Sequence, residues 1–235
     1  MRDGGDASIE RAGQASRAAR HAMVERQLAG RGIHDRAVLA AMEEVPREAF
    51  VDVADPGAAY TDGPLPIGAG QTISQPYVVA LMLQALHLRP GDRMLEVGSG
   101  SGYAAAVAGR IAAEVDAVER HELLVERSRE HLARLGYANV HVHLGDGTLG
   151  LPDRAPFDAI LVSAGGPSVP EALRRQVRVG GRIVIPVGRE ATFQDLEAVT
   201  RSGEDEWQVE SLGAVQFVPL VGAEGWRDRE HGDRP

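Results

Sequence analysis

Three glycines at alternate positions follow an acidic residue: Gly98, Gly100 and Gly102 come after Glu96. Because glycine has no Cβ, such a segment can turn tightly and approach a ligand closely. Residues 93–97 have the composition of a short buried strand, and the alanine-rich residues 103–113 predict a helix. A glycine turn from strand to helix is typical of a site for a nucleotide-like cofactor.

Small differences in this turn indicate which cofactor it binds. Its Gly-x-Gly-x-Gly spacing differs from the Gly-x-Gly-x-x-Gly pattern of dinucleotide sites, where a helix N-terminus meets a pyrophosphate. The carboxylate of Glu96 would repel a phosphate but could accept hydrogen bonds from an amine. These features favour S-adenosylmethionine, which carries an amino-acid end and no phosphate.

Two later strands end in residues that could contact the rest of this cofactor. Residues 115–119 predict a strand ending in Glu119, where the ribose hydroxyls of an adenosyl group would lie. Residues 140–144 predict a third strand, and Asp146 in the turn after it could reach an adenine amino group. The simpler alternatives are that Glu119 is a solvated strand end and that Asp146 only forms a turn. The residues expected to bind S-adenosylmethionine are therefore Glu96, Gly98, Gly100, Gly102, Glu119, Asp146 and Gly147.

The composition excludes several classes of function. The 235 residues include no cysteine, so a disulfide framework, a cysteine zinc site and a thiol nucleophile are impossible. The net charge of −9 argues against nucleic-acid binding. No segment is apolar over the length of a signal peptide or a membrane span. We therefore expect a soluble, cytoplasmic monomer that binds neither nucleic acid nor membranes.

The chain length fits one domain, for which we expect residues 23–226. Residues 1–22 and 227–235 are polar and charged and show no periodic pattern of apolar residues, which predicts disordered tails. Residues 23–90 should form a helical cap followed by a substrate loop, and Gly32 should separate two helices of the cap. The loop itself, residues 60–76, is rich in glycine and proline and should be a long ordered loop or a short hairpin.

Residues 91–226 alternate strand and helix patterns and should form the cofactor-binding sheet. Such alternation predicts an α/β fold with a doubly wound, mostly parallel sheet. Residues 194–201 and 207–220 should pair as an edge hairpin around a polar turn. The strands are expected near residues 93, 115, 140, 158 and 182, and the helices near 103, 122 and 170.

Residues 70–76 read Gly-Gln-Thr-Ile-Ser-Gln-Pro, a motif much more specific than the glycine turn. This motif and several other segments between Met23 and Trp226 resemble those of protein-L-isoaspartate O-methyltransferases. The resemblance implies a seven-stranded, Rossmann-like methyltransferase fold with a reordered C-terminal edge, S-adenosylmethionine as cofactor, and repair of isoaspartyl residues in damaged proteins or peptides. It also implies that Ser74 lies at the methyl-transfer site. The segments that carry it are residues 45–51, 65–76, 95–103, 145–147, 155–158 and 217–220.

The implied reaction makes modest demands on the enzyme. An isoaspartyl residue has a free α-carboxylate that is ionised near neutral pH, so no general base is required. Alignment of the reacting atoms in a dry pocket can contribute roughly 7 to 11 kcal/mol. Ser74 would donate a hydrogen bond to the carboxylate, with Thr72 and Gln75 completing the substrate site. The alternative for Ser74 is a cap on the helix expected over residues 77–88.

Other functions remain open at the level of sequence. Enzymes that methylate amino groups of DNA or RNA usually carry Asn/Asp-Pro-Pro-Tyr after the fourth strand, and residues 162–167 lack it. The remaining alternatives are a peptide-tailoring enzyme that esterifies aspartate in one dedicated peptide, and a module that binds the cofactor without chemistry. His141 and His143 lie on one face of a strand and could ligate a metal, but no third ligand completes a recognisable pattern.

Overall fold

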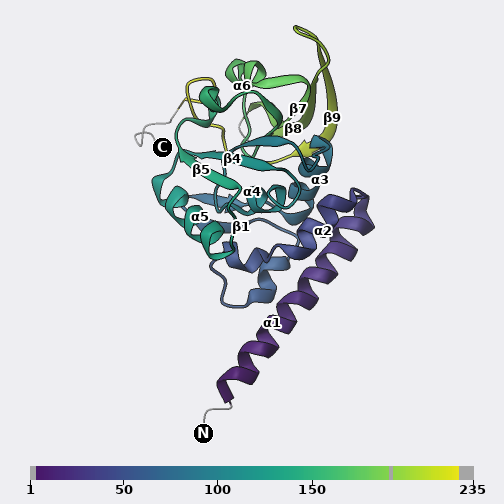
Figure 1. The fold of residues 1–235 in the computed structure, drawn as a ribbon, viewed down its shortest axis with the longest axis vertical. Coiled ribbons are helices and arrows are strands. Elements are labelled where there is room, and N and C mark those ends of the chain that lie inside the picture. Colours follow the sequence, from purple (N-terminus) through teal and green to yellow (C-terminus); the bar gives the residue numbers. More distant parts are fainter. Residues whose placement is uncertain (1–3, 191–192, 228–235) are drawn as a thin grey trace.

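The computed structural model describes residues 4–190 and 193–227, with only the backbone of residues 4–12. A seven-stranded sheet forms its centre (Figure 1). The first five strands in the sheet are parallel to their neighbours, and the last two are antiparallel. The strand order is β5 (Val140–Leu144), β4 (Glu114–Glu119), β3 (Arg93–Val97), β6 (Phe157–Val162), β7 (Val177–Glu190), β8 (Phe193–Arg201) and β9 (Trp207–Val215). The predicted doubly wound fold is confirmed.

The central strands are buried on both faces of the sheet, as parallel strands between helices usually are. Along β3, Met94 packs into one hydrophobic core and its neighbour Leu95 into the other. The first core also contains side chains of α3 (Pro76–Leu86), α4 (Tyr103–Ala108) and α5 (Glu122–Arg134), and the second contains Leu173 of α6 (Glu171–Gln176). Both cores stabilise the strands whose C-terminal ends carry the predicted cofactor residues.

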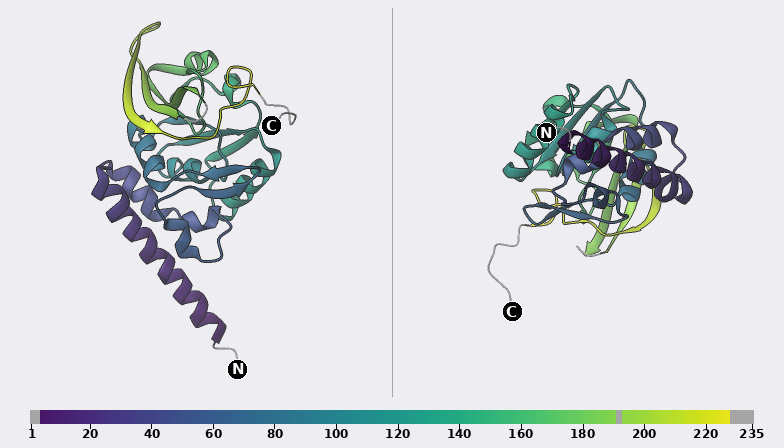
Figure 2. Two further views of the ribbon diagram at one scale, coloured as in Figure 1. Left: turned by 180° about the vertical axis from the view of Figure 1, so that it is seen from behind. Right: turned by 90° about the horizontal axis from the view of Figure 1, so that it is seen from below.

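The N-terminal residues differ from the prediction of a disordered tail. Residues Gly4–Ala22 form helix α1, which extends away from the sheet (Figures 1 and 2). Alanine and arginine are frequent in this segment and favour a helix even without an apolar period. The helix continues into a π-helical turn, Met23–Leu28, whose Met23 side chain is fully buried. The hydrophobic core thus holds the C-terminal end of α1.

The rest of the cap follows the predicted pattern. Gly32, with φ of 98°, ends the first helical region after the 3-10 turn Ala29–Arg31. Helix α2 (Arg36–Glu44) then begins at Asp35, whose carboxylate accepts hydrogen bonds from two backbone amides of the first turn. Two 3-10 turns, Arg47–Phe50 and Pro56–Tyr60, lead to the substrate loop.

The predicted substrate loop contains a short hairpin. Strands β1 (Leu65–Gly68) and β2 (Gln71–Ile73) pair in antiparallel fashion, and Ala69 and Gly70 at the turn both have positive φ. Helix α4, in contrast, ends at Ala108 rather than at residue 113. Gly109 ends this helix where a Cβ would lie 2.7 Å from Val140 Cγ2, so the neighbouring strand leaves room only for glycine.

The C-terminal part forms the predicted edge hairpin of β8 and β9, but β9 ends at Val215 rather than at residue 220. The next residues return across the sheet edge, where Pro219 forms a bridge with Gly165 and the Trp226 indole donates to the Gly165 carbonyl at 2.9 Å. The tail predicted over 227–235 lies, apart from Arg227, outside the described residues. None of the described helices has both the length and the apolar character needed to cross a membrane.

Candidate active site

The glycine turn joins β3 to α4 at the C-terminal edge of the sheet. Gly98, Gly100 and Gly102 have φ values of 82°, 53° and 88°, which other residues rarely adopt. A Cβ on Gly100 would lie 3.0 Å from Ile67 Cδ1, so glycine also lets the β1–β2 hairpin approach the turn. The Gly98 amide donates to the Val118 carbonyl at 2.8 Å and ties the turn to the end of β4.

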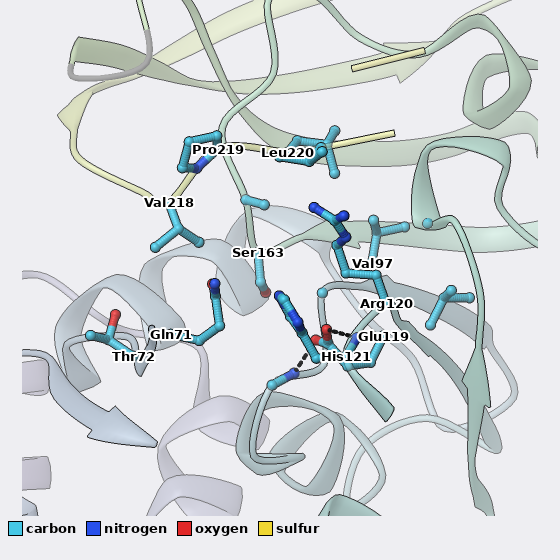
Figure 3. Close-up of a pocket in the computed structure, with 16 residues that line it drawn as sticks. Gln71, Thr72, Val97, Glu119, Arg120, His121, Ser163, Val218, Pro219 and Leu220 are labelled. Carbon is cyan, nitrogen blue, oxygen red and sulfur yellow. Dashed lines mark hydrogen bonds between the residues drawn. The ribbon is translucent and has the colours of Figure 1, made fainter. Parts of the chain in front are cut away.

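Glu119, the last residue of β4, is oriented by backbone amides. Its Oε2 accepts a hydrogen bond from the Gly100 amide at 3.0 Å, and its Oε1 accepts one from the His121 amide at 2.9 Å (Figure 3). The side chain is only 5% exposed but borders a cavity. Because each carboxylate oxygen can accept about two hydrogen bonds, both retain capacity for hydroxyl groups in that cavity.

Two adjoining cavities lie on either side of the glycine turn. The larger, of about 260 Å³, is bordered by Glu119 and His121 and by the segment after β9 (Figure 3). The smaller, of about 40 Å³, is bordered by Ser74 and Glu96. Thr72, Gly98, Gly100 and Ser163 line both cavities. A ligand in the larger cavity can therefore present one end to Ser74.

Glu96 is buried beneath the turn and forms no ion pair within the described residues. Its Oε1 accepts a hydrogen bond from the Ser163 hydroxyl at 3.2 Å, whereas its Oε2 and the nearby Ser99 hydroxyl are buried without a partner. Burial raises the pKa of Glu96 to about 8; the Ser163 hydrogen bond opposes this shift, and the negative charge of Glu119 adds to it. A buried carboxyl group with one oxygen unsatisfied fits an ammonium group. These residues therefore fit the amino-acid end of S-adenosylmethionine.

Ser74 lies between the hairpin and α3. Its carbonyl oxygen accepts a hydrogen bond from the Arg47 guanidinium at 2.9 Å, while its hydroxyl has no hydrogen bond in the described part of the chain. The residue at the N-cap of α3 is Gln75, and no side chain caps this helix. The structure thus gives no support to the alternative in which Ser74 only caps a helix, and it leaves the hydroxyl available to a ligand.

The other two predicted substrate residues occupy different positions. Thr72 is exposed on β2 and lines both cavities. Gln75 is half-buried and lines neither of them. Gln75 helps to fix the start of α3, because its carbonyl accepts the first hydrogen bond of the helix, from the Val79 amide.

Asp146 does not line the larger cavity, although its neighbour Gly147 does. Its Oδ1 accepts hydrogen bonds from the backbone and hydroxyl of Thr148 at 2.9 and 2.7 Å, and its Oδ2 accepts one from the Ala223 amide at 2.7 Å. This carboxylate holds the C-terminal segment, which folds back against the turn and presents backbone amides to it. The contact predicted between Asp146 and an adenine amino group stays a prediction.

Several cavity residues were missed by the sequence analysis. Ser163 directly follows β6, and residues that follow parallel strands meet at one edge of the sheet, so the sequence could have indicated it. Residues 218–221 could not be predicted in this way, because they reach the cavity only through the fold of the chain after β9. The missed residues that border the larger cavity are Gln71, Arg120, His121, Ser163, Ala164, Val218, Pro219, Leu220 and Val221, together with Val97 and Val118 of the strands.

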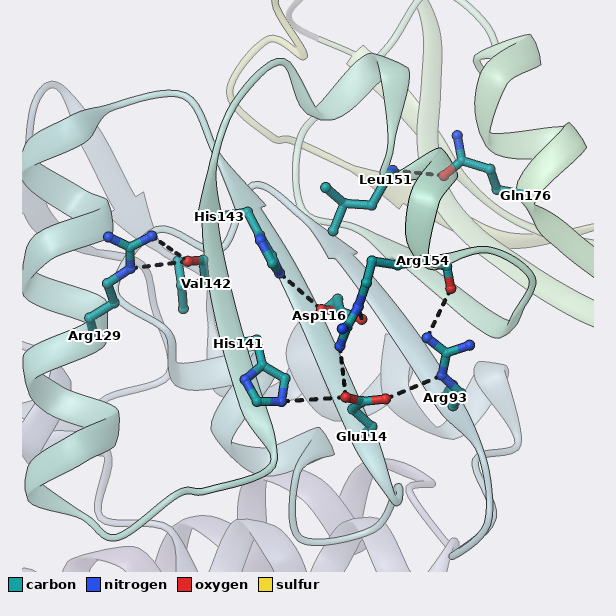
Figure 4. A network of polar contacts seen from close by, with 10 residues as sticks. All are labelled: Arg93, Glu114, Asp116, Arg129, His141, Val142, His143, Leu151, Arg154 and Gln176. Carbon is teal, nitrogen blue, oxygen red and sulfur yellow. Dashed lines mark hydrogen bonds and ion pairs between the residues drawn. The ribbon is translucent and has the colours of Figure 1, made fainter.

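The two histidines considered as metal ligands belong to a network of ion pairs (Figure 4), and neither histidine lines either cavity. His143 Nε2 lies 2.9 Å from an oxygen of the buried Asp116, and His141 Nε2 lies 3.4 Å from Glu114. Arg154 contacts both carboxylates, at 3.1 and 2.7 Å. This network joins β4 and β5 to the segment before β6, which explains the histidines without a metal.

Known proteins match this chain over the cap, the glycine turn and the C-terminal segment. The model of the family Protein-L-isoaspartate(D-aspartate) O-methyltransferase (PCMT) matches residues 18–225. Protein-L-isoaspartate O-methyltransferase 2 of Pelobacter propionicus is 59% identical over 207 residues, which cover 88% of this chain and 92% of that protein. The corresponding enzyme of Rhodopseudomonas palustris is 55% identical over 212 residues, 90% of this chain and 97% of that one.

Solved structures agree with this relationship. A protein-L-isoaspartate O-methyltransferase superposes with a TM-score of 0.81 at 30% identity, over 88% of this chain and 67% of the other. A putative member from Plasmodium falciparum, in complex with S-adenosyl-L-homocysteine, superposes with a TM-score of 0.75 at 29% identity, over 86% of this chain and 98% of the other.

Proposed function

The chain belongs to the protein-L-isoaspartate O-methyltransferase family, and we propose that it methylates the free α-carboxylate of L-isoaspartyl residues in damaged proteins and peptides, with S-adenosylmethionine as methyl donor. The observation that carries this proposal is the pair of adjoining cavities. The larger one is bordered by a buried carboxylate suited to a diol, and the smaller one is bordered by Ser74 and by the buried Glu96. Donor and acceptor can therefore meet at the glycine turn.

Most of the residues that would hold the cofactor line one or both of the two cavities. Glu119 would accept hydrogen bonds from the ribose hydroxyls, and Gly147 would border the adenine. Glu96 and Ser99 would receive the amino-acid end, because their buried oxygens lack partners in the described chain. Gly98, Gly100 and Gly102 would let the backbone approach the ligand. We assign Asp146 a supporting role, since it holds the wall formed by the C-terminal segment.

The bound cofactor would supply an electrophilic methyl group on its sulfonium sulfur. The acceptor carboxylate is ionised near neutral pH, so this chain needs no general base. Ser74 would orient the carboxylate by donating a hydrogen bond, and the exposed Thr72 would bind the substrate at the mouth of both cavities. Gln75 would act indirectly, by fixing the start of α3. Catalysis would then come mainly from alignment in a site with little water.

The proposed product is a methyl ester, which is a better electrophile than the carboxylate. The following backbone nitrogen can attack this ester without the enzyme and expel methanol. The resulting succinimide hydrolyses in part to normal aspartate. Repair therefore requires the protein only for the methyl-transfer step.

The test is incubation with tritium-labelled S-adenosylmethionine and three peptides that differ only in carrying Asp, isoAsp or D-Asp at one position. We expect base-labile label on the isoAsp peptide and none on the Asp peptide. No label on any peptide, with binding of S-adenosylhomocysteine retained, would favour a module without chemistry. A set of isoAsp peptides with unrelated flanking residues separates general repair from a peptide-tailoring enzyme, because only the former methylates most of them.

We further propose that the enzyme acts as a cytoplasmic monomer and does not bind nucleic acid. The net charge of −9 supports the last point, since affinity for nucleic acid comes largely from cationic contacts with phosphates. Sedimentation at several protein concentrations would test the monomer. A mass that rises with concentration would contradict it.

A further inference from the structure

Arg47 is a fully buried arginine behind the substrate loop, with 0% of its side chain exposed. Its Nε donates a hydrogen bond to the Ala59 carbonyl at 2.8 Å, and its Nη2 donates to the Ser74 carbonyl at 2.9 Å. Ala59 precedes the β1–β2 hairpin and Ser74 follows it. One guanidinium therefore holds both ends of the loop that carries the proposed substrate residues.

The charge of Arg47 is not balanced by a carboxylate. It forms no ion pair within the described residues, and the adjacent Glu48 instead accepts a hydrogen bond from the Tyr60 hydroxyl. The Tyr103 ring lies with its centroid 5.0 Å from the guanidinium carbon, and Arg47 Nη1 is buried without a hydrogen-bond partner. Burial lowers the pKa of Arg47, but an arginine remains protonated in proteins. An unpaired buried charge of this kind is unfavourable, because burial removes its hydration.

An unbalanced cation in a poorly hydrated site favours anions nearby, because solvent screens its field only weakly. Its Nη2 contacts the Ser74 carbonyl, and Ser74 lines the smaller cavity. The anion expected at the Ser74 hydroxyl is the isoaspartyl carboxylate.

We infer that Arg47 is a positioning residue for the substrate carboxylate: its two hydrogen bonds fix the backbone of the Ser74 loop, and its charge favours an anion at the Ser74 hydroxyl. The inference rests on the proposed function. Arg47 does not line either cavity and would act through Ser74. A positioning role predicts a higher KM for the isoaspartyl peptide with cofactor affinity retained. A purely structural role predicts that stability, cofactor affinity and turnover fall together.

Two variants of Arg47 and one matched control separate these roles. Arg47→Gln removes the charge but keeps an amide donor, and Arg47→Lys keeps the charge but offers a single donor group. Arg129→Gln is the control, because Arg129 also donates two hydrogen bonds to a backbone carbonyl, that of Val142, and lines neither cavity. Steady-state kinetics on an isoaspartyl peptide would give kcat and KM. Calorimetry with S-adenosylhomocysteine would give its Kd and the fraction of folded sites.

For Arg47→Gln we expect the peptide KM to rise roughly 10-fold and the Kd of S-adenosylhomocysteine to change by less than about 2-fold. Arg47→Lys should raise the peptide KM less, and the control should match the wild type in both. An unchanged peptide KM in folded Arg47→Gln, or a rise matched by an equal loss of cofactor affinity, would overturn the inference. If Arg47→Gln does not fold, an unchanged peptide KM in Arg47→Lys overturns it. A wild-type protein that binds S-adenosylhomocysteine but methylates no peptide would instead refute the proposed function.

Discussion

The Glu119 carboxylate is held by two backbone amides before any ligand binds, so it is already oriented toward the cavity. Glu119→Ala should weaken binding of S-adenosylhomocysteine by about 1 to 3 kcal/mol, because hydrogen bonds to a charged group are lost. Calorimetry measures this effect, and circular dichroism checks the fold. Glu119→Gln should lose less, since its amide oxygen still accepts a hydrogen bond. Unchanged affinity in folded Glu119→Ala would remove Glu119 from the ribose site.

Glu96 should make both stability and cofactor binding depend on pH. Its pKa is about 8 in the folded protein and near 4.5 in an unfolded chain, so the folded state holds the extra proton between these values. Stability should therefore decrease as pH rises through this window, by up to about 1.4 kcal/mol per unit from this residue. Glu96→Gln should flatten that part of the stability curve in thermal melts at several pH values.

The same residue predicts release of a proton when an ammonium group binds beside it. Near pH 7, calorimetry with S-adenosylhomocysteine in buffers of different ionisation enthalpy should show proton release in the wild type and less in Glu96→Gln. Equal proton release in both proteins would mean that Glu96 is already ionised in the free enzyme.

Substitutions of Ser74 can distinguish a role in methyl transfer from a purely structural role. Ser74→Ala should lower methyl transfer to an isoaspartyl peptide with cofactor affinity nearly intact, because the lost hydrogen bond orients the acceptor. A capping residue would instead show a stability loss of about 0.5 to 2 kcal/mol with normal turnover per folded molecule. Ser74→Thr retains a hydroxyl and should keep more activity than the alanine variant. Wild-type turnover in Ser74→Ala would show that the Ser74 hydroxyl is not needed for methyl transfer, and Thr72 would be the next residue to test.

At the level of elements, the sequence predicted what local pattern determines. The strands from β3 to β7 lie at the expected positions, because apolar runs bounded by glycine and acidic residues mark buried parallel strands, and β8 lies where the edge hairpin was expected. Helix α1 was not predicted, because residues 4–22 have no apolar period and only their helical propensity indicates a helix. The end of β9 was placed too late, because the apolar residues Phe217 to Leu220 pack on the sheet without continuing the strand.

The C-terminal segment is an element that Asp146 holds in place. Asp146→Ala should lower stability by about 1 to 3 kcal/mol and also weaken binding of S-adenosylhomocysteine, because Leu220 and Val221 line the cavity. The control is Asp158→Ala, which also removes a carboxylate that accepts a backbone hydrogen bond, from Arg93, but at the start of β6. It should lower stability alone. Thermal melts and calorimetry separate the two effects, and equal cofactor affinity in both variants would contradict a role for the segment.

At the scale of the molecule, the active site combines short-range and long-range features. Glu96, the glycines and Glu119 could be found from the sequence, since the C-terminal ends of parallel strands meet at one edge of a sheet. The burial of Arg47 and the return of residues 218–221 to the cavity could not, because both depend on contacts between distant parts of the chain. The hydrogen bond from the Ala223 amide to Asp146 could not be predicted either, since the two residues lie 77 positions apart in the sequence.

The charge of the whole molecule yields a prediction about partners. A net charge of −9 gives an unfavourable average field for polyanions, and nucleic-acid affinity depends on cationic contacts that release counterions. We expect binding to duplex DNA and RNA to be weaker than about 10⁻⁶ M at physiological salt. Fluorescence anisotropy of labelled duplexes over a range of salt concentrations would measure it, with a basic DNA-binding protein as the positive control. Sub-micromolar affinity that falls steeply with salt would reveal a cationic surface strong enough to overcome the net charge, and would reopen nucleic acid as a partner.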